Sequence, residues 1–200
     1  MKKVALLVAA ALMAPSAFAH QAGDILVRGG AMTVAPTTDS EDTFDVDSNT
    51  QLGLTFSYMV TDNWGVELLA ATPFSHGVSL KGSGEVANVK HLPPTLMAQY
   101  YFGNAQSKVR PYIGAGINYT FFFDEESRGD LQAIDANVEA DDSWGLAAQA
   151  GVDMDVTDNL FVNGSIWYMD IDTDVSVNGN YVDTANIDPI GLMVGLGYRF

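Results

Sequence analysis

The feature that most constrains this chain is a strict alternation of apolar residues with small or polar ones. The final segment shows it most clearly: every second residue from Ile190 to Phe200 is large and apolar or aromatic, and most residues between them are glycine. A period of two places alternate side chains on opposite faces of a β-strand. The same alternation runs through residues 51–60, 113–121 and 143–156, so the chain is expected to be all-β.

Four further segments alternate less cleanly, at about residues 24–34, 64–74, 91–103 and 159–171. The total is eight strands, most of them about 10 to 14 residues long. A tilted strand needs roughly 9–11 residues to cross a bilayer, whereas strands of soluble sandwiches average about 5–6. No stretch after Ala19 approaches 18 consecutive apolar residues, so a spanning helix is not expected. Strand length therefore favours a membrane barrel.

The connections between these strands alternate between short and long. The short ones are residues 61–63, 103–108 and 157–159, and the long, mostly acidic ones are about 35–50, 75–90, 122–142 and 172–186. Outer-membrane barrels have short periplasmic turns and longer outside loops. In hydrocarbon every strand N–H and C=O must be paired, so the sheet must close on itself. The prediction is an eight-stranded antiparallel transmembrane β-barrel in the bacterial outer membrane, with both termini in the periplasm.

Two local predictions concern the connections. Val60–Asn63 and Val156–Asn159 share the tetrapeptide Val-Thr-Asp-Asn. We interpret this as shared hairpin chemistry, with Asp and Asn accepting a left-handed backbone, and not as a domain duplication. Within the third long connection, Leu131 to Ala140 is predicted to form a short helix.

The first 19 residues are predicted to be a secretory signal peptide. Lys2 and Lys3 precede an apolar run from Val4 to Ala14, and Ala17-Phe18-Ala19 has the small-x-small pattern of a cleavage site. This order of features is typical of signal peptides. The alternative is an N-terminal anchor helix, but the run is short for that role. The barrel domain is therefore expected to cover residues 20–200.

Charge and composition exclude several classes of function. Without Lys2 and Lys3 the chain has seven basic and 25 acidic residues, a formal charge of −18, so a nucleic-acid partner is not expected. There is no cysteine. The three histidines, His20, His76 and His91, have no metal-ligand spacing, and no G-x-S-x-G elbow is present. We expect no cofactor, no bound metal and no enzymatic activity.

Several motifs resemble the OmpW family of outer-membrane proteins. They are Ala22-Gly23-Asp24 with Arg28, Thr33-Val34-Ala35-Pro36, the segments 65–74 (GVELLAATPF), 91–95 (HLPPT), 110–119 (RPYIGAGINY) and 167–171 (WYMDI), and the closing Gly197-Tyr198-Arg199-Phe200. The resemblance covers nearly all of the chain after residue 19 and is weakest in the long loops. It implies an eight-stranded barrel with a narrow hydrophobic channel, uptake of small hydrophobic molecules, and exit sideways into the membrane.

The C-terminus also resembles the assembly signal of outer-membrane barrels. Gly195, Tyr198 and the terminal Phe200 match its usual positions, while Met193 replaces the usual polar residue. The barrel assembly machinery is therefore an expected partner during biogenesis.

The parity of each strand predicts a lumen with two zones. The apolar zone toward the outside is a predicted ligand pathway, formed by Leu69, Ala71, Met97, Trp167 and Met169. The zone nearer the periplasm is a predicted polar plug, formed by Arg28, Glu67, Gln99, Asp153, Asp155 and Arg199. Charges in so narrow an interior must be paired, so an open aqueous pore is not expected. Ordinary filling of the lumen is the alternative role for Leu69 and Trp167.

Pro93 and Pro94 are predicted to mark a lateral opening in the wall. Proline lacks the N–H that a strand ladder needs, so two in succession should interrupt the pairing. The alternative is a strand that simply begins after Pro94. A molecule entering from outside could leave at this point without passing the polar zone.

The function that these observations favour is passive uptake of small hydrophobic molecules. The expected partners are these solutes, outer-membrane lipid and lipopolysaccharide. A non-conducting structural, adhesin-like or receptor-like barrel is the main alternative, and a periplasmic lipocalin-like binder is disfavoured by strand length and by Phe200. The acidic loops indicate a solvated surface, or else cation bridging to lipopolysaccharide phosphates.

Overall fold

The computed structural model describes residues 20–37, 44–80, 84–134 and 136–200. The predicted signal peptide, residues 1–19, lies outside these ranges. Within them, no helix combines the length and the apolar character needed to cross a membrane.

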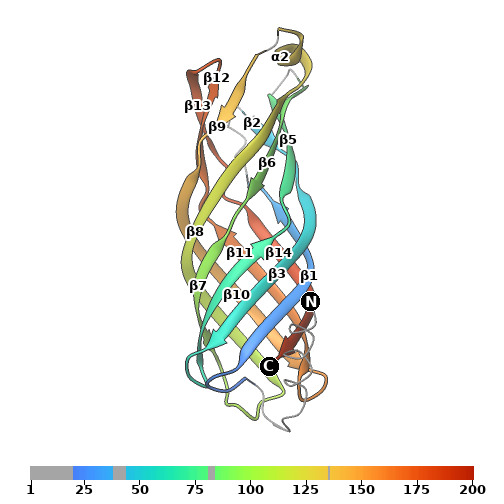
Figure 1. The fold of residues 1–200 in the computed structure, drawn as a ribbon, viewed down its shortest axis with the longest axis vertical. Coiled ribbons are helices and arrows are strands. Elements are labelled where there is room, and N and C mark those ends of the chain that lie inside the picture. Colours follow the sequence, from blue (N-terminus) through green and yellow to red (C-terminus); the bar gives the residue numbers. More distant parts are fainter. Residues whose placement is uncertain (1–19, 38–43, 81–83, 135) are drawn as a thin grey trace, which may run out of the picture.

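Eight antiparallel strands form a closed barrel, which confirms the predicted fold class (Figure 1). In the order of their pairing around the barrel they are β1 (Ile25–Ala35), β3 (Asn49–Met59), β4 (Trp64–Ala71), β7 (Thr95–Tyr101), β8 (Val109–Ser127), β10 (Ser143–Asp155), β11 (Leu160–Met169) and β14 (Ile190–Arg199). β14 pairs back onto β1. The ends of the barrel domain meet there, because Ile25 and Phe200 exchange two backbone hydrogen bonds of 3.3 and 2.9 Å.

The alternation of the sequence separates an apolar outer face from the lumen, as predicted. Along β4, Trp64, Val66 and Leu68 are exposed while Glu67 and Leu69 are fully buried. β7, β10, β11 and β14 show the same parity. Large apolar side chains exposed around the whole wall are the face that hydrocarbon would cover.

The long connections contain more regular structure than expected. Residues 74–92 form a hairpin of β5 (Phe74–Leu80) and β6 (Gly84–Leu92), and residues 172–186 form another, of β12 (Asp172–Val177) and β13 (Asn180–Asn186). Two short strands, β2 (Phe44–Val46) and β9 (Val138–Ala140), pair with β5 and β12. These elements lie beyond the barrel wall, at the upper end of Figure 1.

A short helix forms in the third long connection as predicted, but its bounds differ from Leu131–Ala140. The helix α2 covers Gly129–Ala133, and Val138–Ala140 is the strand β9. Val138 is buried and contacts other valines at the barrel mouth, so packing against the neighbouring hairpins determines the conformation there.

The barrel wall is interrupted at the upper ends of β4 and β7. Pro93–Pro94 separate β6 from β7, and two residues separate β4 from β5 at the same level. The pairing of β4 with β7 ends at Leu69 and Thr95, and the pairing of β5 with β6 begins at Phe74 and His91. Between these two residue pairs the described residues form no ladder pair. Proline is consistent with such a gap because it has no N–H to donate.

The two turns that share a tetrapeptide have one structure, but its cause differs from the prediction. Neither turn contains a left-handed residue; among described non-glycine residues only Asp124, Asn178 and Asp188 have positive φ. Instead, the Thr61 hydroxyl accepts hydrogen bonds from the backbone N–H groups two and three residues later, at 3.2 and 2.9 Å. Thr157 does the same at 3.4 and 3.0 Å. The turn is therefore held by a threonine side chain.

We predict that Val194→Arg, at the middle of β14 on the outer face, lowers the free energy of unfolding by about 2–4 kcal/mol, because the charge would lie in hydrocarbon. Urea unfolding in lipid vesicles measures this change. Ile134→Arg, at an exposed position beyond the barrel wall, is the matched control and should change stability by less than about 0.5 kcal/mol. Equal effects would contradict the assignment of the outer face to lipid.

Candidate functional site

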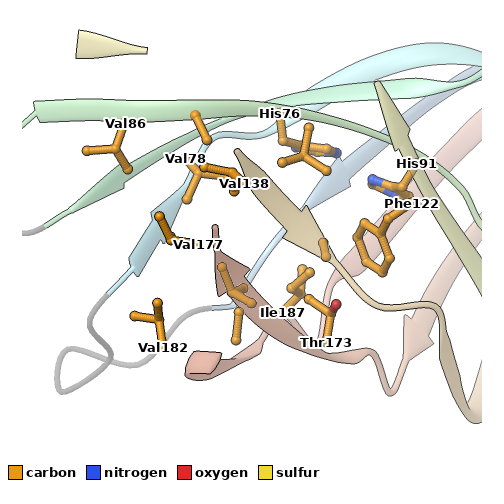
Figure 2. A pocket seen from close by; sticks show the side chains of 15 residues that line it. His76, Val78, Val86, His91, Phe122, Val138, Thr173, Val177, Val182 and Ile187 are labelled. Atoms are coloured by element: carbon orange, nitrogen blue, oxygen red, sulfur yellow. The ribbon is translucent and has the colours of Figure 1, made fainter. Parts of the chain in front are cut away.

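A pocket opens between the hairpins at the loop end of the barrel (Figure 2). Its volume is about 350 Å³. Most of its lining is aliphatic, and the residues that line it are His76, Val78, Val86, Ala87, Val89, His91, Phe122, Val138, Ala140, Thr173, Val175, Val177, Val182, Ala185 and Ile187. An apolar cavity with few polar groups is typical of a small-molecule site.

Most of the pocket is built by strands in segments that were predicted to be loops. Val175 and Val177 of β12 lie two residues apart, as do Ala87 and Val89 of β6, so alternate side chains of each strand face the cavity. Val86 also lines it, where the pairing of β6 with β5 has a register shift. None of the lining residues except His91 belongs to a segment that was predicted to cross the membrane. The missed signal was this short alternation, which is flanked by acidic and glycine residues typical of loops.

Aromatic rings form one side of the pocket. The rings of His76 and His91 are stacked, with centroids 4.9 Å apart, and both contact Phe74. The ring centroid of Phe122 lies 5.8 Å from that of His91. Figure 2 shows these two side chains beside each other. Burial lowers the pKa of His76, which lies in the hairpin beyond the barrel wall, so the ring is neutral at ordinary pH.

The predicted pathway residues lie below the pocket and do not line it. Leu69, Met97, Trp167 and Met169 are fully buried in one apolar cluster, and Ala71 packs against that cluster. Met32 and Met193 belong to the same cluster, so it contains four methionines. Phe122 and Ile187 touch both the cluster and the pocket. The cluster is therefore the floor of the pocket.

Pro93 and Pro94 lie at the level of that floor. The ladder gap beside them is bounded above by Phe74 and His91 and below by Leu69 and Thr95. His91 lines the pocket, and Leu69 belongs to the cluster. The gap in the wall thus lies where the pocket meets its floor.

Below the apolar cluster, Arg28 is the centre of a buried hydrogen-bond network. Its guanidinium donates to Glu67 at 2.7 Å and to both oxygens of Asp153 at 2.6 and 3.2 Å. It also donates to the hydroxyls of Ser57 and Tyr101, at 2.7 and 2.6 Å. All five side chains are at least 98% buried. A buried charge requires this kind of pairing.

Two glutamines complete the partners of Glu67. Gln99 and Gln149 both donate to its second carboxylate oxygen, at 2.8 and 2.9 Å. The hydroxyl of Tyr101 donates to Gln99 at 2.9 Å. Gln149 and Tyr101 were not among the predicted plug residues, although strand parity placed both in the lumen.

The remaining predicted plug residues lie one layer nearer the periplasm. The His20 ring donates to Asp153 at 2.8 Å and accepts from Arg199 at 3.2 Å. The backbone carbonyl of His20 accepts from Arg110 at 2.7 Å. Asp155 is 3.7 Å from Arg199 and is not part of the Arg28 network. His20 was missed as a lumen residue because it precedes the first alternating segment.

The lower zone of the lumen is less polar than predicted. An apolar cluster lies beside the network, formed by Leu26, Met59, Tyr101, Tyr112 and Phe161. The guanidinium of Arg28 lies 5.5 and 5.4 Å from the ring centroids of Tyr112 and Phe161. Aromatic faces therefore contribute to the solvation of this buried cation.

The residues of the predicted assembly signal lie in the folded wall. Gly195 pairs with Gly30 of β1, and a Cβ at Gly195 would lie 2.3 Å from the Gly29 carbonyl oxygen. Tyr198 and Phe200 contact each other edge to face, with centroids 4.7 Å apart. Glycine at position 195 thus permits a close approach of two strands, while recognition by an assembly machinery remains a prediction.

Three acidic side chains also lie close together at the barrel rim, outside the loops in which the acidic residues are most concentrated. The carboxylates of Asp170, Asp172 and Asp188 lie within 4.8 Å of one another. They come from the last long connection and its flanks, whereas the densest acidic runs are in the first and third.

We predict that Asp153→Asn lowers the free energy of unfolding by about 3–5 kcal/mol, because the buried Arg28 loses one of its two counter-charges. Urea unfolding in vesicles measures the loss. Lys90→Met, which removes an exposed 3.2 Å ion pair with Asp124, is the control and should cost less than about 1 kcal/mol. Similar small losses in both variants would show that the network is not a stability element.

Comparison with known proteins agrees with this architecture. The model of the OmpW family matches residues 21–200. Outer membrane protein W of Escherichia coli strain K12 is 50% identical over the full length of both chains. A dibenzothiophene metabolism operon protein, PahQ, of Pseudomonas aeruginosa is 31% identical over 78% of this chain and 74% of its own.

A solved structure gives the same result. The crystal structure of the outer membrane protein OprG from Pseudomonas aeruginosa superimposes with a TM-score of 0.85 at 45% identity, over 91% of this chain and 98% of that one. The relatives and solved neighbours of this chain are outer-membrane proteins, which confirms the predicted location in the outer membrane. The eight strands of the barrel place both of its ends on one side of the membrane, which was predicted to be the periplasmic side. This chain belongs to the OmpW family of bacterial outer-membrane β-barrel proteins.

Proposed function

We propose that this protein is a passive outer-membrane channel for small hydrophobic molecules, which leave it sideways into the lipid. The observation that carries the proposal is the position of the ladder gap. An apolar pocket at the outer end, the gap in the wall and the floor of the pocket meet at His91 and Leu69.

A route straight through the barrel is opposed by the polar network. A hydrophobic molecule would have to separate Arg28 from Glu67 and Asp153, which are buried and paired. Breaking a buried pair is strongly unfavourable, and the molecule would offer no replacement partner. A route through the wall avoids this cost, because the molecule passes from an apolar pocket to hydrocarbon.

The floor of the pocket is made of side chains that can move aside. Met32, Met97, Met169 and Met193 belong to the apolar cluster. Methionine has three rotatable bonds and adapts to irregular space, so the cluster can rearrange around a passing molecule. This supports Leu69, Ala71, Met97, Trp167 and Met169 as residues along the pathway.

The relatives are consistent with an apolar substrate. The name of PahQ connects that protein with the metabolism of dibenzothiophene, an apolar aromatic compound. We extend this chemical class, and not the individual compound, to the present protein. Lipid and lipopolysaccharide around the wall, and the barrel assembly machinery acting on Gly195, Tyr198 and Phe200, remain its proposed partners.

We predict that replacing Pro93 and Pro94 together by threonine reduces the uptake of an apolar solute into liposomes to near the protein-free rate. Both new residues can donate an N–H, which allows the ladder to close. Pro111→Thr, on the outer face of β8, is the matched control and should transport normally. Unchanged uptake by the double variant would remove the lateral route.

A second prediction tests the pathway from inside. Ala71→Trp adds a large ring where the cluster meets the ladder gap, and we expect it to reduce uptake by at least several-fold. Ala98→Trp places the same ring on the outer face of β7 and should leave uptake unchanged. Comparable rates for both variants and the wild type would place the route elsewhere.

The packed lumen supports one alternative function. The cluster and the Arg28 network together fill the barrel below the pocket, as expected of a non-conducting structural or surface-interaction barrel. Liposome uptake decides between the two: a conducting protein admits apolar solutes faster than polar ones of equal size, and a non-conducting one admits neither above the protein-free rate.

A further inference from the structure

One corner of the apolar pocket contains a polar atom without a partner. The side chain of His76 is 96% buried, and its Nε2 forms no hydrogen bond within the part of the chain that the structure describes. An enclosed acceptor or donor of this kind is unfavourable unless something pairs with it. His76 lines the pocket, so a molecule held there can supply that partner.

The hydrogen bonding of the ring determines what kind of partner this is. Nδ1 of His76 is hydrogen-bonded to the backbone carbonyl of Asp47. A carbonyl oxygen only accepts, so Nδ1 carries the proton. In a neutral imidazole the other nitrogen is then an acceptor. Nε2 therefore offers a lone pair and requires a donor.

Water is a poor donor at this position. A buried water needs two to four polar partners, and apart from His76 only His91 and Thr173 bring polar side-chain atoms to the lining. The hydroxyl of Thr173, another polar group of the lining, already donates to the Asp141 carbonyl at 2.6 Å. A donor carried by an otherwise apolar molecule fits better, because the rest of the molecule is solvated by the pocket.

We propose that Nε2 of His76 is a recognition point for an O–H or N–H group of the ligand. The ligand class is a small apolar molecule with a single donor, such as a phenol or a fatty alcohol. Side chains cover Nε2, so the donor reaches it when the stacked ring of His91 shifts. His91 borders the ladder gap, where it pairs with Phe74 on one side and with Phe122 on the other. This inference rests on the proposed apolar channel and adds a specificity to it.

Two ligands that differ only in the donor test the proposal on the wild-type protein. 2-Naphthol has a hydroxyl, and 2-methoxynaphthalene has the same rings and an ether oxygen without a proton. Binding is measured by ligand fluorescence in liposomes, with protein-free liposomes used to subtract partition into lipid. One added hydrogen bond corresponds to about 2- to 10-fold tighter binding of 2-naphthol.

Two variants test whether His76 causes the preference for 2-naphthol over 2-methoxynaphthalene. His76→Phe keeps a planar ring and removes the acceptor, so the ratio of the two affinities should fall to about one while 2-methoxynaphthalene binds as before. Ser75→Ala is the control: Ser75 is the preceding residue of β5, its hydroxyl donates to Asn88 at 2.8 Å, and it does not line the pocket. The ratio should be unchanged in this variant.

The possible outcomes separate this inference from the proposed function. Equal affinities in the wild type, or a ratio that survives His76→Phe, would overturn the recognition point and leave the apolar channel standing. Failure of both ligands to bind the wild type would overturn both. If His76→Phe does not assemble, the wild-type ratio alone decides.

Discussion

The structure depends on one requirement: in hydrocarbon, every backbone N–H and C=O of a strand must find its partner within the sheet. Eight strands meet this requirement with a closed ladder, and closure at this number leaves a lumen only wide enough for side chains or a slim ligand. The interior then has to be filled. Its lower part is filled by paired charges around Arg28 and its middle by an apolar cluster that is rich in methionine.

This requirement is not met at one level of the wall, the ladder gap beside Pro93 and Pro94. The barrel contains different groups below and above this level. Below it, passage would require breaking the ion pairs of Arg28. Above it, the hairpins enclose an apolar pocket in a region where water can solvate an exposed strand edge. Pro93 and Pro94 lie at this level, where the ladder is incomplete, and the proposed lateral route crosses the wall there. A break lower in the wall would open onto buried charges instead.

The sequence predicted the barrel well because alternation is imposed locally by lipid on one face of each strand. It failed where other forces determine conformation. β5, β6 and β12 have short alternating runs among glycine and polar residues, and their apolar faces are buried against one another, β9 and Phe122. The network also could not be read completely: Arg28 and Asp153 are 125 residues apart, and local pattern places both in the lumen without showing that Tyr101 and Gln149 join them.

The pocket illustrates why a binding site and its scaffold leave different traces in a sequence. Lipid selects for apolar residues at every second position along a whole strand, so that signal is long and repeated. The pocket needs only two or three inward residues from each of several hairpins, and their outward neighbours are polar because they face water. His76 is the extreme case. One hydrogen bond to the Asp47 carbonyl determines which of its nitrogens is an acceptor, and therefore which ligand group it suits. That information exists only once the two segments are side by side.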